Sequence, residues 1–162
     1  MPDSRSDVPD VIVFPPLILL AVLLAALLLQ WLVPLGLLQS VPFAARIGFA
    51  IPLLACGMAL SVAAIRTFAR LGTAVRPSEP ATALATTGPF AWTRNAMYLA
   101  GYRIMLALAL TFGLDWIVPG MALATFVLHR GVILREERYL EAKFGESYRA
   151  YRARVPRYLG PI

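Results

Sequence analysis

The stretch Gly88-Pro89-Phe90-Ala91-Trp92-Thr93-Arg94-Asn95-Ala96-Met97-Tyr98-Leu99-Ala100-Gly101 decides how this chain is organised. Gly88-Pro89 marks a turn, and Trp92 is a residue type typical of a membrane–water interface. After the polar pair Arg94-Asn95 the chain becomes apolar. The stretch therefore predicts a loop that leads into a membrane helix, with a cation and a side-chain amide at the start of that helix.

A second polar cluster, Arg135-Glu136-Glu137, lies where the next long apolar stretch ends. If the two apolar stretches form a helical hairpin, both polar clusters lie at the same face of the membrane. Arg, Asn, Tyr and paired Glu side chains gathered at one face can bind a polar ligand. The sequence thus predicts a ligand site where the two ends of the hairpin meet.

The composition is that of a membrane protein. Of the 162 residues, 59% are hydrophobic and only 15% are charged, and the apolar residues come in long blocks. This indicates one small integral membrane domain rather than an ordinary soluble one. The net charge of +6 comes mainly from basic segments at 66–103 and 130–157, which are typical of the cytoplasmic side and of contact with anionic lipid. Nucleic acid is disfavoured as a partner, because no basic helix or aromatic platform stands clear of the apolar blocks.

The chain has one cysteine, Cys56, and one histidine, His129. One residue of each type argues against a structural zinc site, and no metal site is predicted. Because Cys56 lies in an apolar run, we expect it to be a small buried filler.

The apolar blocks predict an all-α integral membrane fold of about four transmembrane helices. The first span, expected at residues 11–33, would be roughly 34 Å long at about 1.5 Å per residue, which is enough to cross the hydrocarbon core. The other three spans are expected at 43–69, 95–112 and 116–134. Residues 1–10 are polar, with two prolines and three aspartates, and we expect them to be a disordered lead to the single domain of residues 11–162.

Residues 136–155 are expected to form an amphipathic cytoplasmic tail, broken or bent at Gly145. Apolar and aromatic residues recur in it at three- and four-residue steps: Leu140, Phe144, Tyr148, Tyr151 and Val155. Such a stripe is suited to lying on a membrane surface. Four spans put both termini on one side, and the charge bias puts that side in the cytoplasm. This predicts a multi-pass protein of the inner (cytoplasmic) membrane.

The polar residues suggest a ligand rather than a catalytic group. No Ser-His-Asp arrangement, metal-ligand cluster or phosphate-binding glycine loop stands out, so no catalytic residue is assigned. Arg94 can hold a carboxylate through paired hydrogen bonds, and Tyr98 lies on the same helix face one turn later. A glutamate at 136 or 137 can hold vicinal hydroxyls or an ammonium group, so the set suits a zwitterionic cofactor with a ribose. The alternative is that Glu136 and Glu137 only pair with Arg94 or with arginines of their own helix.

Two further arginines are candidates for holding a substrate. Arg103 lies inside the third expected span, where charges are costly and often functional; the alternative is that it snorkels toward the cytoplasmic face. Arg135 could hold or steer an anionic head group, and Arg103 could do so from deeper in the membrane.

The two polar clusters also carry a resemblance. The stretch from Thr87 to Gly101 resembles a motif of the isoprenylcysteine carboxyl methyltransferases and the related phospholipid methyltransferases. The pattern Glu136-Glu137-x-x-Leu140-x-x-x-Phe144-Gly145-x-x-Tyr148-x-x-Tyr151-x-x-x-Val155-Pro156-Arg157 resembles the closing motif of the same family. The likeness covers roughly residues 72–158, about half of the chain.

The resemblance implies an integral membrane enzyme that uses S-adenosylmethionine. It implies a cofactor pocket at the cytoplasmic face and a lipid-borne substrate that arrives sideways from the bilayer. Carried over by position, these residues should line the cofactor: Thr82, Ala83, Leu84, Ala85, Phe90, Arg94, Asn95, Ala96, Met97, Tyr98, Glu136 and Glu137. Glu136 should make the family's acidic contact to the cofactor.

The sequence departs from the family pattern at the start of the third span. The family's His or Asn before a proline is Asn95 here, but the proline itself is replaced by Ala96, which removes a fixed turn. Phe90 stands where the family often has a tyrosine, so one hydroxyl is absent.

Methyl transfer from a sulfonium requires alignment and exclusion of water more than acid–base catalysis, which fits a site without an obvious base. The sequence therefore predicts a membrane methyltransferase acting on a lipid-borne or amphiphilic acceptor. Two other interpretations stay open. One is a membrane reductase with a nicotinamide cofactor, resembling the steroid 5-alpha-reductases, and the other is a non-catalytic membrane protein with the same fold.

Overall fold

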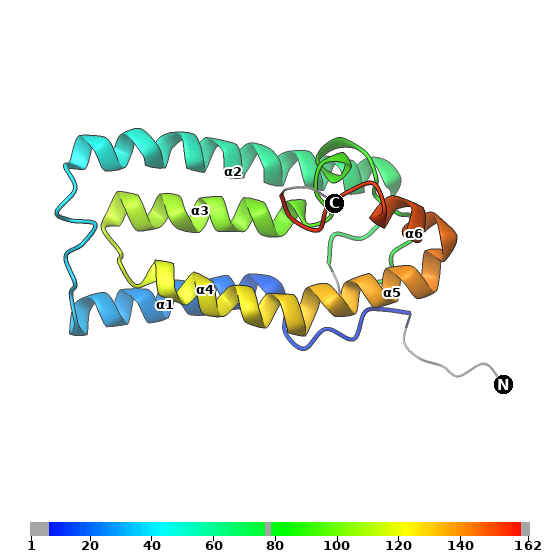
Figure 1. The fold of residues 1–162 in the computed structure, drawn as a ribbon, viewed down its shortest axis with the longest axis horizontal. Helices are drawn as coiled ribbons and strands as arrows, with labels where there is room; N and C mark the ends of the chain where they lie inside the picture. Colours follow the sequence, from blue (N-terminus) through cyan, green and yellow to red (C-terminus); the bar gives the residue numbers. More distant parts are fainter. Residues whose placement is uncertain (1–6, 77–78, 160–162) are drawn as a thin grey trace.

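The structure, a computed structural model, describes residues 7–76 and 79–159, and within these ranges it contains helices and loops but no strand. Figure 1 shows the arrangement. The elements follow in the order α1 (Pro15–Leu32), α2 (Phe43–Leu71), the 3-10 turn η1 (Gly88–Ala91), α3 (Ala96–Phe112), α4 (Ile117–Leu128), the π-helical turn η2 (His129–Ile133), α5 (Leu134–Phe144) and α6 (Glu146–Arg152).

Three helices are long and apolar enough to cross a membrane: α1, α2, and the continuous helix from Ile117 to Phe144 that joins α4, η2 and α5. The helix α3 is apolar but shorter. The described residues therefore confirm an all-α fold with helices suited to a membrane, while the number of membrane crossings stays a prediction. The first helix starts later than expected, at Pro15-Pro16, because a proline lacks the N–H that a helix interior requires but is tolerated in the first turn.

The apolar helices lie side by side, as Figure 1 shows. α3 packs along α2, and α1 packs on α4. The short connections at 33–42 and 113–116 lie at one end of this bundle, whereas the loop after α2, the helices α5 and α6, and the segments that precede α1 and follow α6 lie at the other end. The two polar clusters of the sequence therefore come to the same end.

Gly57 sets how closely α2 approaches α3. A Cβ atom at this position would lie 2.9 Å from Cγ1 of Ile104 and 3.0 Å from the carbonyl oxygen of Ala100. Both distances are shorter than ordinary contacts, so a larger residue would push the two helices apart. Small residues at such crossings allow helices in membranes to pack tightly.

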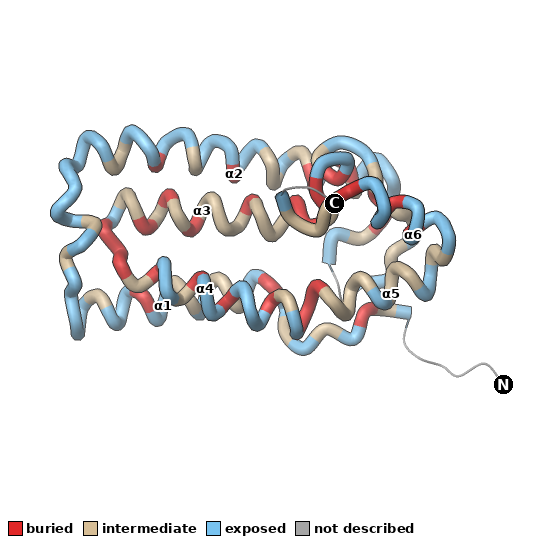
Figure 2. Tube along the Cα trace, in the orientation of Figure 1, coloured by how far each residue is buried: buried red, intermediate tan, exposed pale blue. Residues whose placement is uncertain are grey.

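The outward faces of α1 and α2 carry large exposed apolar side chains, including Leu24, Leu28, Phe49 and Ile51. Figure 2 shows exposed positions along both helices. Such faces suit contact with lipid tails. The expectation that Cys56 is a buried filler is wrong, because its side chain is exposed on α2.

Residues 7–10, the described part of the polar lead, contact the rest of the protein. Asp7 pairs with Lys143 at 2.6 Å and Asp10 pairs with Arg135 at 2.7 Å, and Pro9 between them is buried. The expectation of a disordered lead is therefore wrong for residues 7–10, because acidic side chains of the lead meet basic side chains of α5. Residues 1–6 of the predicted lead lie outside the described residues.

The amphipathic tail folds against the protein. Gly145, with a φ of 53°, separates α5 from α6 as expected. The stripe of the tail, however, does not face outward, because Tyr148, Tyr151 and Val155 are buried and pack with Leu84. The surface-lying stripe expected from the sequence is thus replaced by a small core between the tail and the loop after α2.

These two ends of the bundle generate a prediction about orientation. In a variant without the exposed cysteine (Cys56→Ala), we expect Leu37→Cys to react with a membrane-impermeant maleimide from outside intact cells. Arg154→Cys should react only after the membrane is permeabilised. The physical reason is the excess of arginine at the end that holds Arg154, which favours the cytoplasmic side. Labelling of Arg154→Cys but not of Leu37→Cys in intact cells would contradict this orientation.

Candidate functional site

One cavity of about 520 Å³ lies where α1, α3 and α5 meet the loop after α2. Its volume falls in the range of about 300–1,000 Å³ found for small-molecule sites. Polar side chains line the part near the start of α3, and apolar side chains of α1 and α3, among them Leu19, Leu23, Ile104 and Met105, line the rest. The cavity thus has a polar part and an apolar part.

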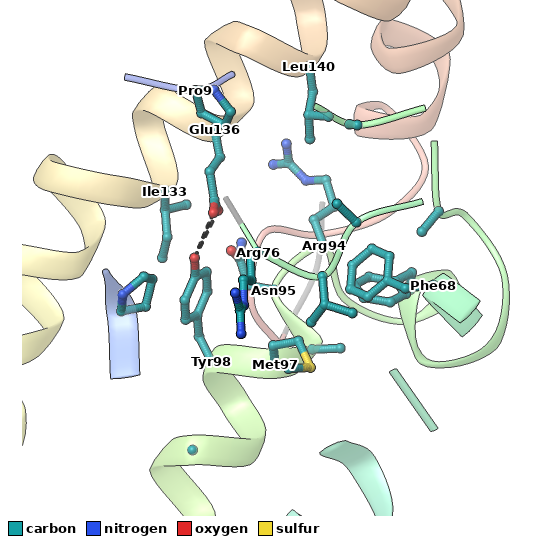
Figure 3. Close-up of a pocket in the computed structure, with 18 of the residues that line it drawn as sticks. Pro9, Phe68, Arg76, Arg94, Asn95, Met97, Tyr98, Ile133, Glu136 and Leu140 are labelled. Carbon is teal, nitrogen blue, oxygen red and sulfur yellow. Dashed lines mark hydrogen bonds between the residues drawn. The ribbon is translucent and has the colours of Figure 1, made fainter. Parts of the chain in front are cut away.

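Tyr98 and Glu136 face each other across the polar part, one from α3 and the other from α5 (Figure 3). The Tyr98 hydroxyl donates to the carboxylate of Glu136, at 2.8 Å from Oε1 and 3.0 Å from Oε2. Within residues 7–76 and 79–159, no Arg, Lys or His forms a salt bridge with Glu136. Glu136 is therefore a carboxylate of the cavity wall that retains acceptor capacity for a cation or for hydroxyl groups.

Glu137 is bound by two arginines instead. Nε and Nη2 of Arg157 lie 2.8 Å from Oε1 and Oε2 of Glu137, and Nη1 of Arg94 lies 3.0 Å from Oε1. The side chains of Arg94 and Glu137 are 9% and 12% exposed. Pairing with arginine, the alternative that the sequence left open, thus describes Glu137 but not Glu136.

Residues 155–158, which we call the C-terminal strap, hold the start of α3. The backbone N–H of Arg94 donates to the carbonyl of Pro156 at 3.0 Å. The carbonyl of Arg157 accepts from the Thr93 hydroxyl at 3.1 Å and from the Asn95 side-chain amide at 2.9 Å. These bonds fix the chain at α3 although no proline stands at position 96, and they occupy the side-chain amide of Asn95.

Aromatic residues of α6 cover the polar part. The buried Tyr151 hydroxyl donates to the carbonyl of Phe90 at 2.7 Å, and the Phe90 ring packs on Phe68 with centroids 4.9 Å apart. The Tyr148 hydroxyl accepts a hydrogen bond from Nη1 of Arg94 at 3.2 Å. Burial raises the pKa of both tyrosines above the ordinary value, so their hydroxyls keep their protons at neutral pH.

The loop after α2 forms another wall. The Tyr139 hydroxyl on α5 accepts from the backbone N–H of Ala81 at 3.0 Å, and the Thr73 hydroxyl accepts from the backbone N–H of Thr82 at 3.0 Å. The Thr82 hydroxyl itself donates to the carbonyl of Gly72 at 2.9 Å. The Thr82 side chain therefore stabilises the loop, while residues 83–85 line the cavity.

The structure brings most residues expected at the cofactor to the wall of this cavity. These are Ala83, Leu84, Ala85, Phe90, Arg94, Asn95, Ala96, Met97, Tyr98, Glu136 and Glu137. Thr82 does not line it.

The two arginines expected at the substrate do not line the cavity either. Arg103 donates to the carbonyl of Leu99, one turn earlier on its own helix, at 3.0 Å, and Arg135 pairs with Asp10 of the lead. Whether Arg103 snorkels toward the cytoplasmic face stays a prediction.

Several residues at the site were not expected there. Pro9 lines the cavity, as does Arg76, whose side chain is 70% exposed. The polar lead gave no signal for Pro9, because its position depends on the ion pairs of its neighbours. Arg157 stands in the closing motif, but spacing alone could not show that it meets Glu137.

Comparisons with known proteins place the chain in a family. A family model described as phospholipid methyltransferase matches residues 45–147, more than half of the chain. The chain is also 43% identical over 65 residues to an uncharacterized protein from Haemophilus influenzae, and the alignment covers 39% of this chain and 100% of that protein. No solved structure matches the chain at a significant level.

The cover over the cavity can be tested at Tyr151. Tyr151→Phe should lower the free energy of unfolding by about 1–3 kcal/mol, because the buried carbonyl of Phe90 would lose its donor. Chemical unfolding in detergent, followed by tryptophan fluorescence, would measure the loss. Ser147→Ala, which removes a hydroxyl from an exposed position of the same helix, should leave stability unchanged. Equal stability of Tyr151→Phe and the unmutated protein would contradict the role given to this bond.

Proposed function

This chain belongs to the phospholipid methyltransferase family, part of the wider group that includes the isoprenylcysteine carboxyl methyltransferases, and on that premise we propose its activity. It transfers a methyl group from S-adenosylmethionine to a lipid-borne or amphiphilic acceptor. The observation that carries the proposal is the cavity, in which polar groups suited to a zwitterion adjoin an apolar wall.

The polar part supports S-adenosylmethionine as the cofactor. Glu136 accepts only the Tyr98 hydroxyl among the described residues, so it can also accept from an ammonium group or from ribose hydroxyls. Arg94 would face the carboxylate of the same ligand. Phe90, Met97 and the neighbouring alanines offer apolar contact for an adenine ring. The cofactor residues expected from the resemblance fit this division, except Thr82.

The residues of the site would promote the reaction by alignment. S-adenosylmethionine supplies an electrophilic methyl group on a sulfonium, and the acceptor must present its nucleophile in line with the bond that breaks. Tyr98 and Glu136 would fix one end of the cofactor, and Arg94 would fix the other. Tyr148, Tyr151 and Phe90 close the site above them and would exclude water. Holding the reactants in line and away from water accounts for much of the rate in such reactions.

The apolar part supports an amphiphilic acceptor. Leu19, Leu20 and Leu23 of α1 line it, and Leu20 is 49% exposed. A tail could therefore lie against α1 and reach the bilayer, while the head group meets the cofactor. Arg76, which lines the cavity, is better placed to contact an anionic head group than Arg103 or Arg135, which do not line it.

The location follows from the same proposal. We place the protein in the inner (cytoplasmic) membrane as a multi-pass protein with its termini in the cytoplasm. The polar part of the cavity would then open toward the compartment that contains S-adenosylmethionine, and its apolar part would lie at the depth of the lipid tails. Membrane lipids and the acceptor are the partners that this placement requires.

The cofactor assignment can be tested at Glu136. Glu136→Gln should weaken binding of S-adenosylmethionine about tenfold to a hundredfold, because one charged hydrogen bond is worth roughly 1.5–3 kcal/mol. Calorimetric titration of the purified protein in lipid nanodiscs would measure the change. The matched control is Glu141→Gln on the same helix, since Glu141 pairs with Arg152 and does not line the cavity. Identical titrations for the two variants would contradict the assignment, and binding of NADPH instead would favour a reductase.

The acceptor class can be tested by removing the tail. We expect the enzyme in lipid to methylate either phosphatidylethanolamine or S-farnesyl-N-acetylcysteine, and to leave the tailless glycerophosphoethanolamine and N-acetylcysteine unchanged. Transfer of radiolabelled methyl groups would be measured for all four compounds. Equal rates for a tailed compound and its tailless head group would rule out entry from the bilayer and favour a soluble acceptor.

A further inference from the structure

Arg94, Glu137 and Arg157 form a cluster with two cations and one carboxylate, in which Arg94 and Glu137 are largely buried and Arg157 is 33% exposed. They come from the start of α3, from α5 and from the C-terminal strap. The cluster therefore keeps a positive charge beside the cavity. Of the three, Arg94 and Glu137 line the cavity and Arg157 does not.

The two arginines bind Glu137 in different ways. Arg157 makes the paired contact, with Nε and Nη2 each 2.8 Å from one carboxylate oxygen. This fork is the strongest geometry between guanidinium and carboxylate. Arg94 contacts Oε1 through Nη1 alone, at 3.0 Å. Arg157 thus holds both oxygens of Glu137, and Arg94 holds one.

Arg94 retains unused donors as a result. Its Nη1 also donates to the Tyr148 hydroxyl, but its Nε is buried and has no partner in the described part of the chain. The Arg94 side chain is only 9% exposed, so this donor is largely removed from water. Nε is therefore closed to a ligand as well. The Nη2 group of Arg94 is not among the buried donors without a partner and makes no hydrogen bond to the described residues, so it is the donor that an anionic group of a ligand in the cavity can reach.

The C-terminal strap fixes Arg157 relative to Arg94. The carbonyl of Arg157 accepts from the side chains of Thr93 and Asn95, the residues on either side of Arg94. The carbonyl of Pro156 accepts from the backbone N–H of Arg94 itself. The two guanidinium groups are therefore held by one local network, and Arg157 cannot shift without disturbing the start of α3.

We propose that Arg157 is a positioning residue that engages Glu137 and so leaves Arg94 free to bind an anionic group of the ligand. The inference rests on the proposed function, under which that group is the carboxylate of S-adenosylmethionine. When Arg157 is removed, Glu137 binds Arg94 through both carboxylate oxygens. The donors of Arg94 are then occupied, and the positive charge beside the cavity is neutralised.

The test compares two cofactors that differ only in the carboxylate: S-adenosylmethionine and decarboxylated S-adenosylmethionine. Both are titrated calorimetrically against purified protein in lipid nanodiscs. Arg157→Ala should weaken binding of S-adenosylmethionine about tenfold to a hundredfold and should leave binding of the decarboxylated form within about twofold. The second ligand also shows that the variant is folded.

A double variant gives the sharper result. In Arg157→Ala with Glu137→Gln, the side chain that captures Arg94 loses its charge, so the affinity for S-adenosylmethionine should return to within about threefold of the unmutated protein. A merely structural role for Arg157 predicts that the double variant binds no better than the single one. Arg157→Lys keeps the charge but not the paired contact, so its affinity for S-adenosylmethionine should lie between those of Arg157→Ala and the unmutated protein. It replaces Arg157→Ala in the test if that variant does not fold.

The matched control is Arg152→Ala, which removes an arginine from another ion pair between α6 and α5. It should bind both cofactors as the unmutated protein does. Equal weakening of both cofactors by Arg157→Ala, or failure of the double variant to recover, would overturn the inference and leave the proposed function standing. If the unmutated protein binds neither cofactor, the proposed function fails and this inference fails with it.

Discussion

Hydrogen bonds from residues 93–95 to the carbonyls of Pro156 and Arg157 connect the first residues of α3 to the last described part of the chain. The rest of the site depends on them. They hold α6 over the polar end of the cavity, where Tyr151 reaches the Phe90 carbonyl, and they bring Arg157 to Glu137. The two motifs of the sequence are thus two halves of one structure, since each supplies the hydrogen-bonding partners of the other.

The sequence predicted the fold well where hydrophobicity alone decides it. Long apolar blocks specify membrane helices, and the expected ends of the second and third spans lie within two residues of α2 and α3. It also predicted that Tyr98 and Glu136 lie at the same end of a hairpin, because a short turn forces the neighbouring helices to run antiparallel. Their hydrogen bond follows from that geometry.

Sequence reasoning was weaker where long-range pairing decides the position. Asp7 and Asp10 were predicted to belong to a disordered lead, because nothing in the local sequence shows that Lys143 and Arg135 lie opposite them. The apolar stripe of residues 136–155 was predicted to face lipid, because periodicity reveals an apolar face but not what covers it. Arg103 and Arg135 were predicted to contact a substrate. A charge near a membrane face can pair with the protein as well as with a ligand, and the sequence does not show which of these occurs.

The π-helical turn at His129–Ile133 has a consequence for the electrostatics of the site. Such a turn holds one residue more than an α-helical turn, and each residue of an α-helix rotates the following side chains by about 100°. If the same residues ran through this point as a regular α-helix, Arg135 would take the direction of Glu136, and Glu136 would take that of Glu137. The cavity would then face one acid and one base instead of two acids. A single added residue in this turn therefore decides which charged side chains of α5 face the cavity.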